Sequence, residues 1–210
     1  MKSGIDSLLV AAERYYTTRL RENGATHWGV DWNSAEGQET RFRQLLRVIR
    51  GGGDEFSIND YGCGYGSLHE FMMRQGTKFL YQGFDISAAM IESATAITGE
   101  ASNARFHVGH NPGEIADYSV ASGIFHVKQD TSGPVWHDYM LATLDDMQKH
   151  SRKGFAFNSL TTYSDKEKMR GHLYYANPSE VFDHCMRKYS RNVALLHDYG
   201  LYEFTVIVRL

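Results

Sequence analysis

The stretch Ile58–Gly66, INDYGCGYG, decides the fold because it sets three glycines at alternate positions directly after a short apolar run. Asp60 stands two residues before the first of these glycines. A glycine-rich turn between a strand and a helix lets a ligand approach the backbone closely at the carboxyl edge of a parallel sheet. The glycines alone suit several nucleotide-like ligands. The segments that flank the turn therefore have to identify the ligand.

Segments on both sides of the turn alternate between strand and helix patterns. Phe56–Tyr61 is predicted as the first strand, and Leu68–Met73 begins the helix after the glycines. A second strand, Phe79–Ile86, is closed by Asp85 and is followed by a helix with Ser87 at its N-cap. Later strands are predicted at 106–108, 118–127 and 154–160, with helices over 136–147 and from 178 onward.

The two ends of the chain depart from this alternation. Val193–Leu196 and the strictly alternating apolar residues of 202–208 predict two antiparallel strands joined by a short turn. In the first fifty residues, apolar side chains recur at helical spacing instead, and three consecutive glycines end the predicted helix. We therefore expect a helical N-terminal lobe over residues 1–53 and an α/β domain over residues 54–210.

Composition narrows the class of protein. The chain has 210 residues, of which 42% are hydrophobic and 22% charged, as in an ordinary globular protein with a core. The formal charge of −3 offers no broad positive field, so no nucleic-acid partner is expected. Two cysteines give neither a disulfide framework nor metal-ligand spacing. Without a secretion signal or an apolar span, we expect a soluble cytoplasmic protein with no membrane partner.

The residues 60–66 and 83–87 resemble two motifs of the class I S-adenosylmethionine-dependent methyltransferases. The first is an acid followed by alternate glycines, and the second is an acid that closes the second strand. The terminal hairpin is similar to the reversed seventh strand of that family. The resemblance covers about residues 54–210. It implies a Rossmann-like, seven-stranded, mostly parallel sheet with a terminal antiparallel hairpin and an N-terminal helical cap.

The resemblance also implies how the cofactor, S-adenosylmethionine, is held. Asp85 would accept hydrogen bonds from the ribose hydroxyls, and Ile86 would cover the adenine base. Asp60 would lie near the ammonium group, because a cationic amino-acid head favours a carboxylate partner. The bed beneath the cofactor would be formed by Gly62, Gly64 and Gly66.

The resemblance implies further cofactor contacts at three places. After the third strand the family often has an acid, and here His110 or Asn111 would take its place beside the adenine, unless they only form a polar turn. Ser122 and Gly123 would line the methionine side. Arg41 could bind the cofactor carboxylate through a bidentate pair; the alternative is a salt bridge to a neighbouring acid.

His126 stands at the end of the predicted fourth strand and is the candidate general base. A base helps only if the acceptor must lose a proton. The other interpretation is a histidine whose hydrogen bonds a backbone carbonyl satisfies. Asp130 lies further along, but no cluster with metal-ligand spacing appears, so no metal is expected.

The acceptor side is marked only by aromatic residues. In this family N-terminal helices often form a lid, and the aromatic segment around Trp32 favours one here. Candidates for acceptor contact are Trp32, Tyr163, Tyr174, Tyr175 and His197. Half-buried packing is the alternative for the three tyrosines and for His197.

We expect a methyltransferase that forms an O-methyl or N-methyl product on a small-molecule acceptor, with S-adenosylhomocysteine as its other product. Two alternatives stay open. One is a non-catalytic, S-adenosylmethionine-binding regulatory subunit, and the other is a nicotinamide-dependent oxidoreductase. Against the latter stand Asp60, Ser67 in place of a spaced glycine or alanine, and the antiparallel end. No motif encodes the acceptor or the oligomeric state.

Overall fold

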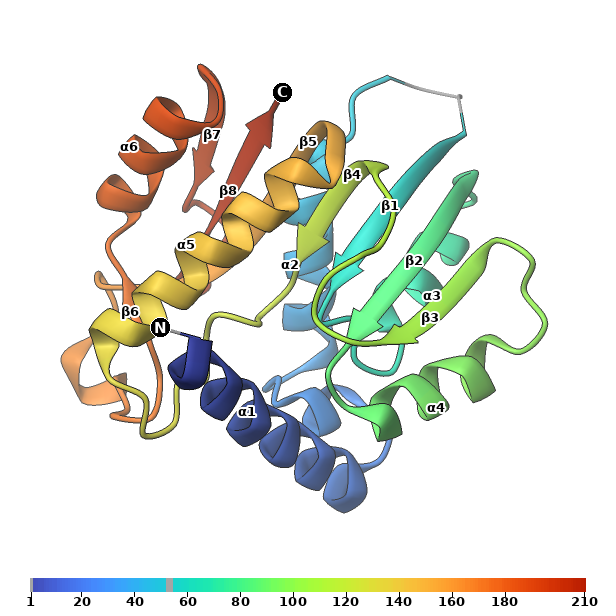
Figure 1. The fold of residues 1–210 in the computed structure, drawn as a ribbon, viewed down its shortest axis with the longest axis horizontal. Helices are drawn as coiled ribbons and strands as arrows, with labels where there is room; N and C mark the ends of the chain where they lie inside the picture. The colour runs from blue at the N-terminus through green and yellow to red at the C-terminus, as the bar shows by residue number, and fades with distance from the viewer. Residues whose placement is uncertain (1, 52–54) are drawn as a thin grey trace.

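A mixed β-sheet forms the centre of the molecule, with helices on both of its faces (Figure 1). The computed structural model describes residues 2–51 and 55–210. The strands are β1 Phe56–Tyr61, β2 Phe79–Asp85, β3 Ala104–Val108, β4 Ala116–Ala121, β5 Ser151–Thr161, β6 Tyr175–Ala176, β7 Asn192–Leu196 and β8 Glu203–Arg209. The helices are α1 Lys2–Asn23, α2 Ala35–Leu45, α3 Ser67–Arg74, α4 Ala88–Thr98, α5 Gly133–Lys149 and α6 Pro178–Lys188, with short 3₁₀ turns η1 His27–Val30, η2 Leu46–Val48 and η3 Lys166–Lys168.

The sheet has the order β3-β2-β1-β4-β5-β8-β7, and β6 pairs with β5 beside this path. Pairs from β3 to β5 are parallel, whereas β8 is antiparallel to both β5 and β7. The predicted Rossmann-like sheet with a terminal antiparallel hairpin is confirmed. The described residues form eight strands rather than seven, because the two-residue β6 is too short to leave a pattern in the sequence.

The predicted fourth strand is too long at its carboxyl end. β4 ends at Ala121, and His126 N–H donates to the carbonyl of Gly123, which turns the chain out of the sheet. Phe125 and Val127 are nevertheless buried. A short apolar run signals burial without distinguishing a strand from a buried turn, and this is why the prediction ran past the strand.

Two buried clusters separate the faces of the sheet. On one face α2 and α3 pack against the sheet, and their residues Phe42, Leu45 and Phe71 belong to the same buried cluster as Ile58 and Ile207 of the strands. On the other face α5 and α6 cover the sheet and contribute Met140, Leu144, Met147, Val181 and Cys185 to a second buried cluster. Figure 1 shows α5 in front of the sheet with α2 and α3 behind it.

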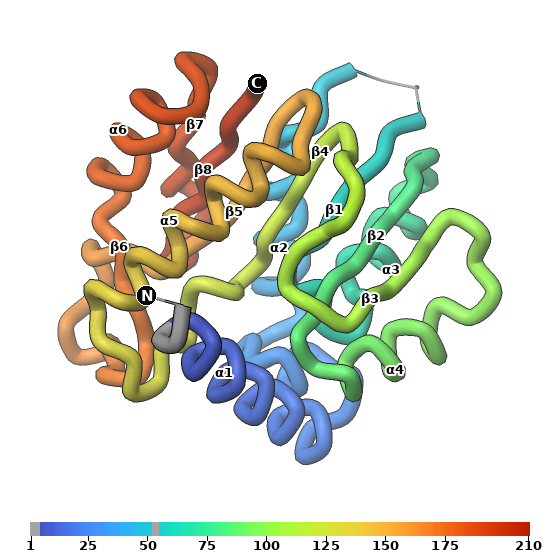
Figure 2. The backbone as a smooth tube through the Cα atoms, in the orientation of Figure 1, coloured from blue at the N-terminus to red at the C-terminus, as the bar shows by residue number. Residues whose placement is uncertain are grey.

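The helices of the predicted N-terminal lobe occupy different places. Figure 2 shows the chain running through α1 below the sheet and then turning up behind it as α2. The Oγ1 atom of Thr17 lies 2.7 Å from the Oγ atom of Ser87, which joins α1 to the start of α4. α1 therefore covers the carboxyl ends of the strands, whereas α2 belongs to the core layer. The predicted boundary at residue 53 lies outside the described residues.

No helix within 2–51 or 55–210 combines the length and the apolar character needed to cross a membrane.

Gly154 of β5 marks a point where three segments meet closely. A Cβ atom at this position would lie 2.4 Å from the carbonyl oxygen of Val208 in β8 and 3.2 Å from Cγ2 of Val48 in η2. Neither neighbour can move freely, because one is a backbone atom in a central ladder and the other is fully buried. The absence of a side chain at Gly154 therefore allows β8 and η2 to pack on β5.

We predict that Gly154→Ala lowers the free energy of unfolding by about 1–3 kcal/mol, the usual cost of overpacking a core. Urea denaturation measures this directly. Gly113→Ala is the matched control, since a Cβ atom there meets nothing within 4 Å. Equal stability of the two variants would contradict the close approach.

Candidate functional site

A pocket lies at the carboxyl ends of β1, β2 and β4, and α1 forms its opposite wall. We call it the strand-end pocket. The empty space between its walls amounts to about 950 Å³, a figure that includes open solvent. Of the sequence-predicted site residues, it is lined by Trp32, Asp60, Gly62, Gly64, Asp85, Ile86, His110, Ser122 and Gly123.

The glycine turn forms the floor of the strand-end pocket. The N–H groups of Gly62 and Cys63 both donate to the carbonyl of Phe84, at 2.8 and 3.0 Å, and so hold the turn to the end of β2. Gly62 and Gly64 have φ values of 71° and 55°, in the left-handed region that glycine adopts readily. Gly66 has a different place: it caps α3 and packs against Phe106 without lining the pocket.

Asp85 connects the glycine turn to α4. Its Oδ2 atom accepts from Gly64 N–H at 2.9 Å, and its Oδ1 atom accepts from Ser87 N–H at 2.9 Å. Burial raises the pKa of Asp85 to about 6, while these two hydrogen bonds act in the opposite direction. Each carboxylate oxygen can accept two hydrogen bonds. One acceptor position on each oxygen is therefore left for a ligand with paired hydroxyl groups.

Asp60 lines the strand-end pocket, and one of its carboxylate oxygens has no hydrogen-bond partner among the described residues. Its Oδ2 atom accepts from the Tyr81 hydroxyl at 2.5 Å, but its Oδ1 atom has no partner among the described residues. Burial raises the pKa of this carboxyl to about 7, and the charge of Asp85 raises it further. A buried oxygen without a partner is costly. A cationic ligand group would remove that cost, so the site fits the ammonium group of the amino-acid part of S-adenosylmethionine.

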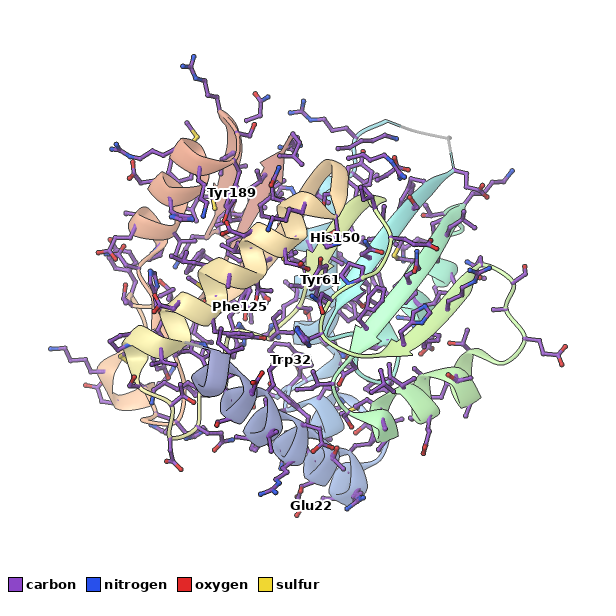
Figure 3. The ribbon with its side chains drawn as sticks, in the orientation of Figure 1. Glu22, Trp32, Tyr61, Phe125, His150 and Tyr189 are labelled. Carbon is purple, nitrogen blue, oxygen red and sulfur yellow. The ribbon has the colours of Figure 1, made fainter. Side chains whose placement is uncertain are left out.

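The remaining polar wall comes from the segment after β4. The Ser122 hydroxyl is buried without a hydrogen-bond partner in the described part of the chain and lines the pocket. Gly123 N–H donates to the Asn158 Oδ1 atom at 2.7 Å, and the α-carbon of Gly123 lies against the Trp32 ring. Figure 3 shows Trp32 between α1 and the strand ends.

Sequence analysis missed most of the apolar wall. α1 and the start of α5 contribute Leu8, Leu9, Ala12, Tyr16, Trp136 and Tyr139, and other segments contribute further apolar residues, among them Val30, Phe42, Leu68, Met90 and Ile124. The helical spacing in α1 indicated an apolar face, but spacing alone does not tell whether a helix packs on a sheet or covers a pocket. The indole N–H of Trp136 donates to the carbonyl of Phe125 at 2.9 Å, which fixes this side chain in the wall.

Arg41 and His126 lie beside the strand-end pocket but do not line it. The Nε atom of Arg41 donates to Oε2 of Glu203 at 2.9 Å, so the guanidinium is already paired with a carboxylate. His126 is buried, and burial together with the charge of Arg41 lowers its pKa to about 3. Neither placement favours the cofactor contact predicted for Arg41 or the general base predicted for His126.

The other predicted acceptor residues are also outside the pocket wall. Tyr163 is 71% exposed, beside His197, which stacks on Phe204. The Tyr174 hydroxyl pairs with Nδ1 of His137, and the Tyr175 hydroxyl accepts from a backbone N–H. The structure brings Trp32 to the pocket and leaves these four elsewhere. Within the described residues no three His, Cys, Asp or Glu side chains gather as potential metal ligands.

We predict that Asp60 makes the free energy of unfolding fall with rising pH. The native state keeps the Asp60 proton until its pKa of about 7, whereas an ordinary aspartate releases it near 3.8. The contribution of Asp60 to the free energy of unfolding is fully present below the unfolded-state pKa. It is lost as pH rises to the native-state pKa, by roughly 1.4 kcal/mol for each unit between the two pKa values.

Urea denaturation between pH 4 and pH 8 measures the effect as the difference between the wild type and Asp60→Asn. The fall should be smaller in the variant, since its amide does not titrate. Asp117→Asn serves as the control, because the pKa of Asp117 is lowered and its contribution changes at lower pH with the opposite sign. Parallel pH profiles of the wild type and Asp60→Asn would contradict the assignment.

Comparison with known proteins gives one sequence relative and a large group of similar structures. No protein-family model matches the chain. The sequence is 49% identical over 164 residues to "Putative methyltransferase Rv1506c" of Mycobacterium tuberculosis (strain H37Rv). The aligned part covers 78% of this chain and 98% of the relative.

Two solved structures with bound S-adenosylhomocysteine share the fold at low identity. Magnesium protoporphyrin IX methyltransferase of Synechocystis PCC 6803 has a TM-score of 0.67 at 12% identity, covering 95% of this chain and 98% of that chain. N-methyltransferase NodS of Bradyrhizobium japonicum WM9 has a TM-score of 0.66 at 16% identity, covering 94% and 97%. The relative at 49% identity shows that the chain belongs to the methyltransferases, and the solved structures show that it has the fold of the class I methyltransferases.

Proposed function

We propose that this enzyme transfers the methyl group of S-adenosylmethionine to an oxygen or nitrogen of a small, uncharged acceptor in the strand-end pocket. The observation that carries the proposal is that the pocket lining combines two kinds of residue. We call Asp60, Asp85 and the glycine turn its polar half, and the apolar side chains, which include those of α1 and α5, its apolar half.

The polar half suits the cofactor. The free Oδ1 atom of Asp60 would accept from the ammonium group, and the two oxygens of Asp85 would accept from the ribose hydroxyls. Gly62 and Gly64 would lie beneath the cofactor, with Ile86 and His110 at the adenine. Ser122 and Gly123 would border the methionine side. Asp60 and Asp85 are the acidic residues in this set, so binding of the cofactor would depend on their two carboxylates.

The apolar half suits an uncharged acceptor. Among the described residues that line the pocket, Asp60 and Asp85 are the acidic ones, and neither lysine nor arginine contributes. A phosphorylated or carboxylated acceptor would find no counter-ion there. Aromatic rings of Tyr16, Trp32 and Tyr139 offer faces for stacking on a planar group. We therefore propose a small molecule and no nucleic acid as the substrate.

The chain would contribute mainly by positioning. When bound, S-adenosylmethionine would supply a methyl group activated by its sulfonium. The transfer would form a bond from the acceptor atom to the methyl carbon, break the carbon–sulfur bond, and release S-adenosylhomocysteine and the proton of the acceptor to solvent. Orienting two reactants in this way accounts for up to about 7–11 kcal/mol of a barrier in favourable cases. The walls formed by Trp32, Tyr139 and the glycine turn would fix that geometry and exclude water.

Membership of the methyltransferases removes the support for a nicotinamide-dependent oxidoreductase or a non-catalytic binding subunit. The accepting atom is proposed as oxygen or nitrogen because each of these atoms carries a lone pair that can form the bond to the methyl carbon. NodS is an N-methyltransferase.

We predict that Asp60→Asn weakens binding of S-adenosylhomocysteine about tenfold, since the ammonium group loses a charged partner. Binding of 5′-methylthioadenosine should stay the same, because that ligand lacks the amino-acid part. Isothermal titration calorimetry at pH 8 measures both affinities.

S-adenosylhomocysteine should also raise the Tm of the wild type, whereas NADH should not. Equal losses for both nucleosides would contradict the role of Asp60, and a Tm shift with NADH alone would contradict the proposed function.

We also predict that the methyl label enters the low-mass fraction of a cell extract. A cell extract, with or without nuclease and protease treatment, is divided into low-mass and high-mass fractions by ultrafiltration. Each fraction is then incubated with the enzyme and methyl-labelled S-adenosylmethionine. The labelled product should be a small molecule that an anion-exchange resin does not retain at neutral pH. Asp85→Ala, which loses the ribose acceptor, is the inactive control. Label confined to RNA, DNA or protein would contradict the proposed acceptor class.

A further inference from the structure

A buried polar network lies directly behind the acceptor side of the strand-end pocket. At its centre is Glu203, the first residue of β8, whose side chain is fully buried. Its Oε2 atom accepts from Arg41 Nε at 2.9 Å, and its Oε1 atom accepts from Asn158 Nδ2 at 3.2 Å. Arg41 is 12% exposed, so both members of this ion pair are shielded from water.

One arm of this network reaches the pocket through Arg41. The guanidinium carbon lies 3.9 Å above the centre of the Trp32 ring, close enough for a cation–π contact. Trp32 lines the strand-end pocket, and its other neighbours include His126, whose ring is 5.4 Å away at right angles. The position of the Trp32 ring therefore depends on where Glu203 holds Arg41.

The other arm reaches the pocket through Asn158. This residue lies on β5, and its Oδ1 atom accepts from Gly123 N–H at 2.7 Å while its amide nitrogen donates to Glu203. Gly123 also lines the pocket, with a φ of 80°. A Cβ atom on Gly123 would lie 2.5 Å from the Trp32 ring, so the ends of the two arms touch each other.

We propose that Glu203 is a positioning residue that fixes Trp32 and the Gly123 turn as one rigid wall of the pocket. This inference rests on the proposed function in that the wall is taken to contact the cofactor and the acceptor. Glu203 is not one of the described residues that line the pocket. It acts on the pocket through Arg41 and Asn158.

The energetics favour a specific role over simple stabilisation. Removing two charges from water costs free energy that a buried ion pair recovers only with good geometry, and uncharged residues of the same volume often serve stability as well. Here three charged or polar side chains converge from α2, β5 and β8, and both arms end in the wall of one pocket. The geometry joins the terminal antiparallel hairpin to the site.

The test uses two variants, because removing one partner of a buried ion pair could unfold the protein. Glu203→Gln keeps the shape but removes the charge. The double variant Arg41→Met with Glu203→Gln replaces the pair with neutral side chains of similar size and should fold. Leu144→Ala, a core change on α5 outside the pocket lining, is the control for a general loss of stability.

Without ligand, acrylamide should quench the tryptophan fluorescence of both network variants more strongly than that of the wild type. Trp32→Phe in the same background should abolish this gain. With S-adenosylhomocysteine, calorimetry should show about tenfold weaker binding for the double variant. Adding Trp32→Phe to it should cause little further loss, as expected when two changes act through one contact.

The inference would be overturned if a folded double variant showed the same acrylamide quenching and the same affinity for S-adenosylhomocysteine as the wild type. It would also be overturned if Leu144→Ala, at the same Tm as the double variant, lost as much affinity. These outcomes are separate from a failure of the proposed function. If the wild type bound no S-adenosylhomocysteine, the proposed function would fail, while the quenching of the ligand-free protein would still decide whether Glu203 positions Trp32.

Discussion

The two hydrogen bonds accepted by Asp85 organise the part of the molecule on which the site depends. One oxygen holds the backbone of the glycine turn and the other holds the start of α4, so a single carboxylate joins two connections that follow neighbouring strands. Parallel strands bring their carboxyl ends to one edge. Asp85 then determines how closely the segments beyond those ends approach each other, and the α1 residue Thr17 rests on the same corner through Ser87.

The strand-end pocket is built in two steps of different kinds. Local rules form its floor, since β1 leads into a turn that only glycines enter easily, and the buried acids follow from the strand ends. Long-range packing forms its roof. α1 lies over the pocket because side chains far apart in sequence meet there, as Thr17 and Ser87 do across 70 positions of the chain.

The division between what the sequence predicted and what it did not follows these two steps. β1 was predicted to the residue, and the places of Gly62, Gly64, Asp60 and Asp85 at the pocket agree with a motif of short sequence span. The partner of Arg41 could not be predicted, because Glu203 is 162 residues away and meets it only through the antiparallel return of β8. Local sequence likewise did not reveal that the apolar stretch after Ala121 leaves the sheet, since a buried turn and a buried strand require the same residue types.

The position of α1 gives the two halves of the pocket separate origins in the chain. The acids and glycines of the polar half come from the ends of central strands, which the core holds in place, whereas one peripheral helix contributes Leu8, Leu9, Ala12 and Tyr16 to the apolar half. Under the proposed assignment, inherited substitutions on the pocket-facing side of that helix would alter which compound is methylated without changing how S-adenosylmethionine is bound. Divergent members of such a lineage would then differ most at their amino-terminal ends.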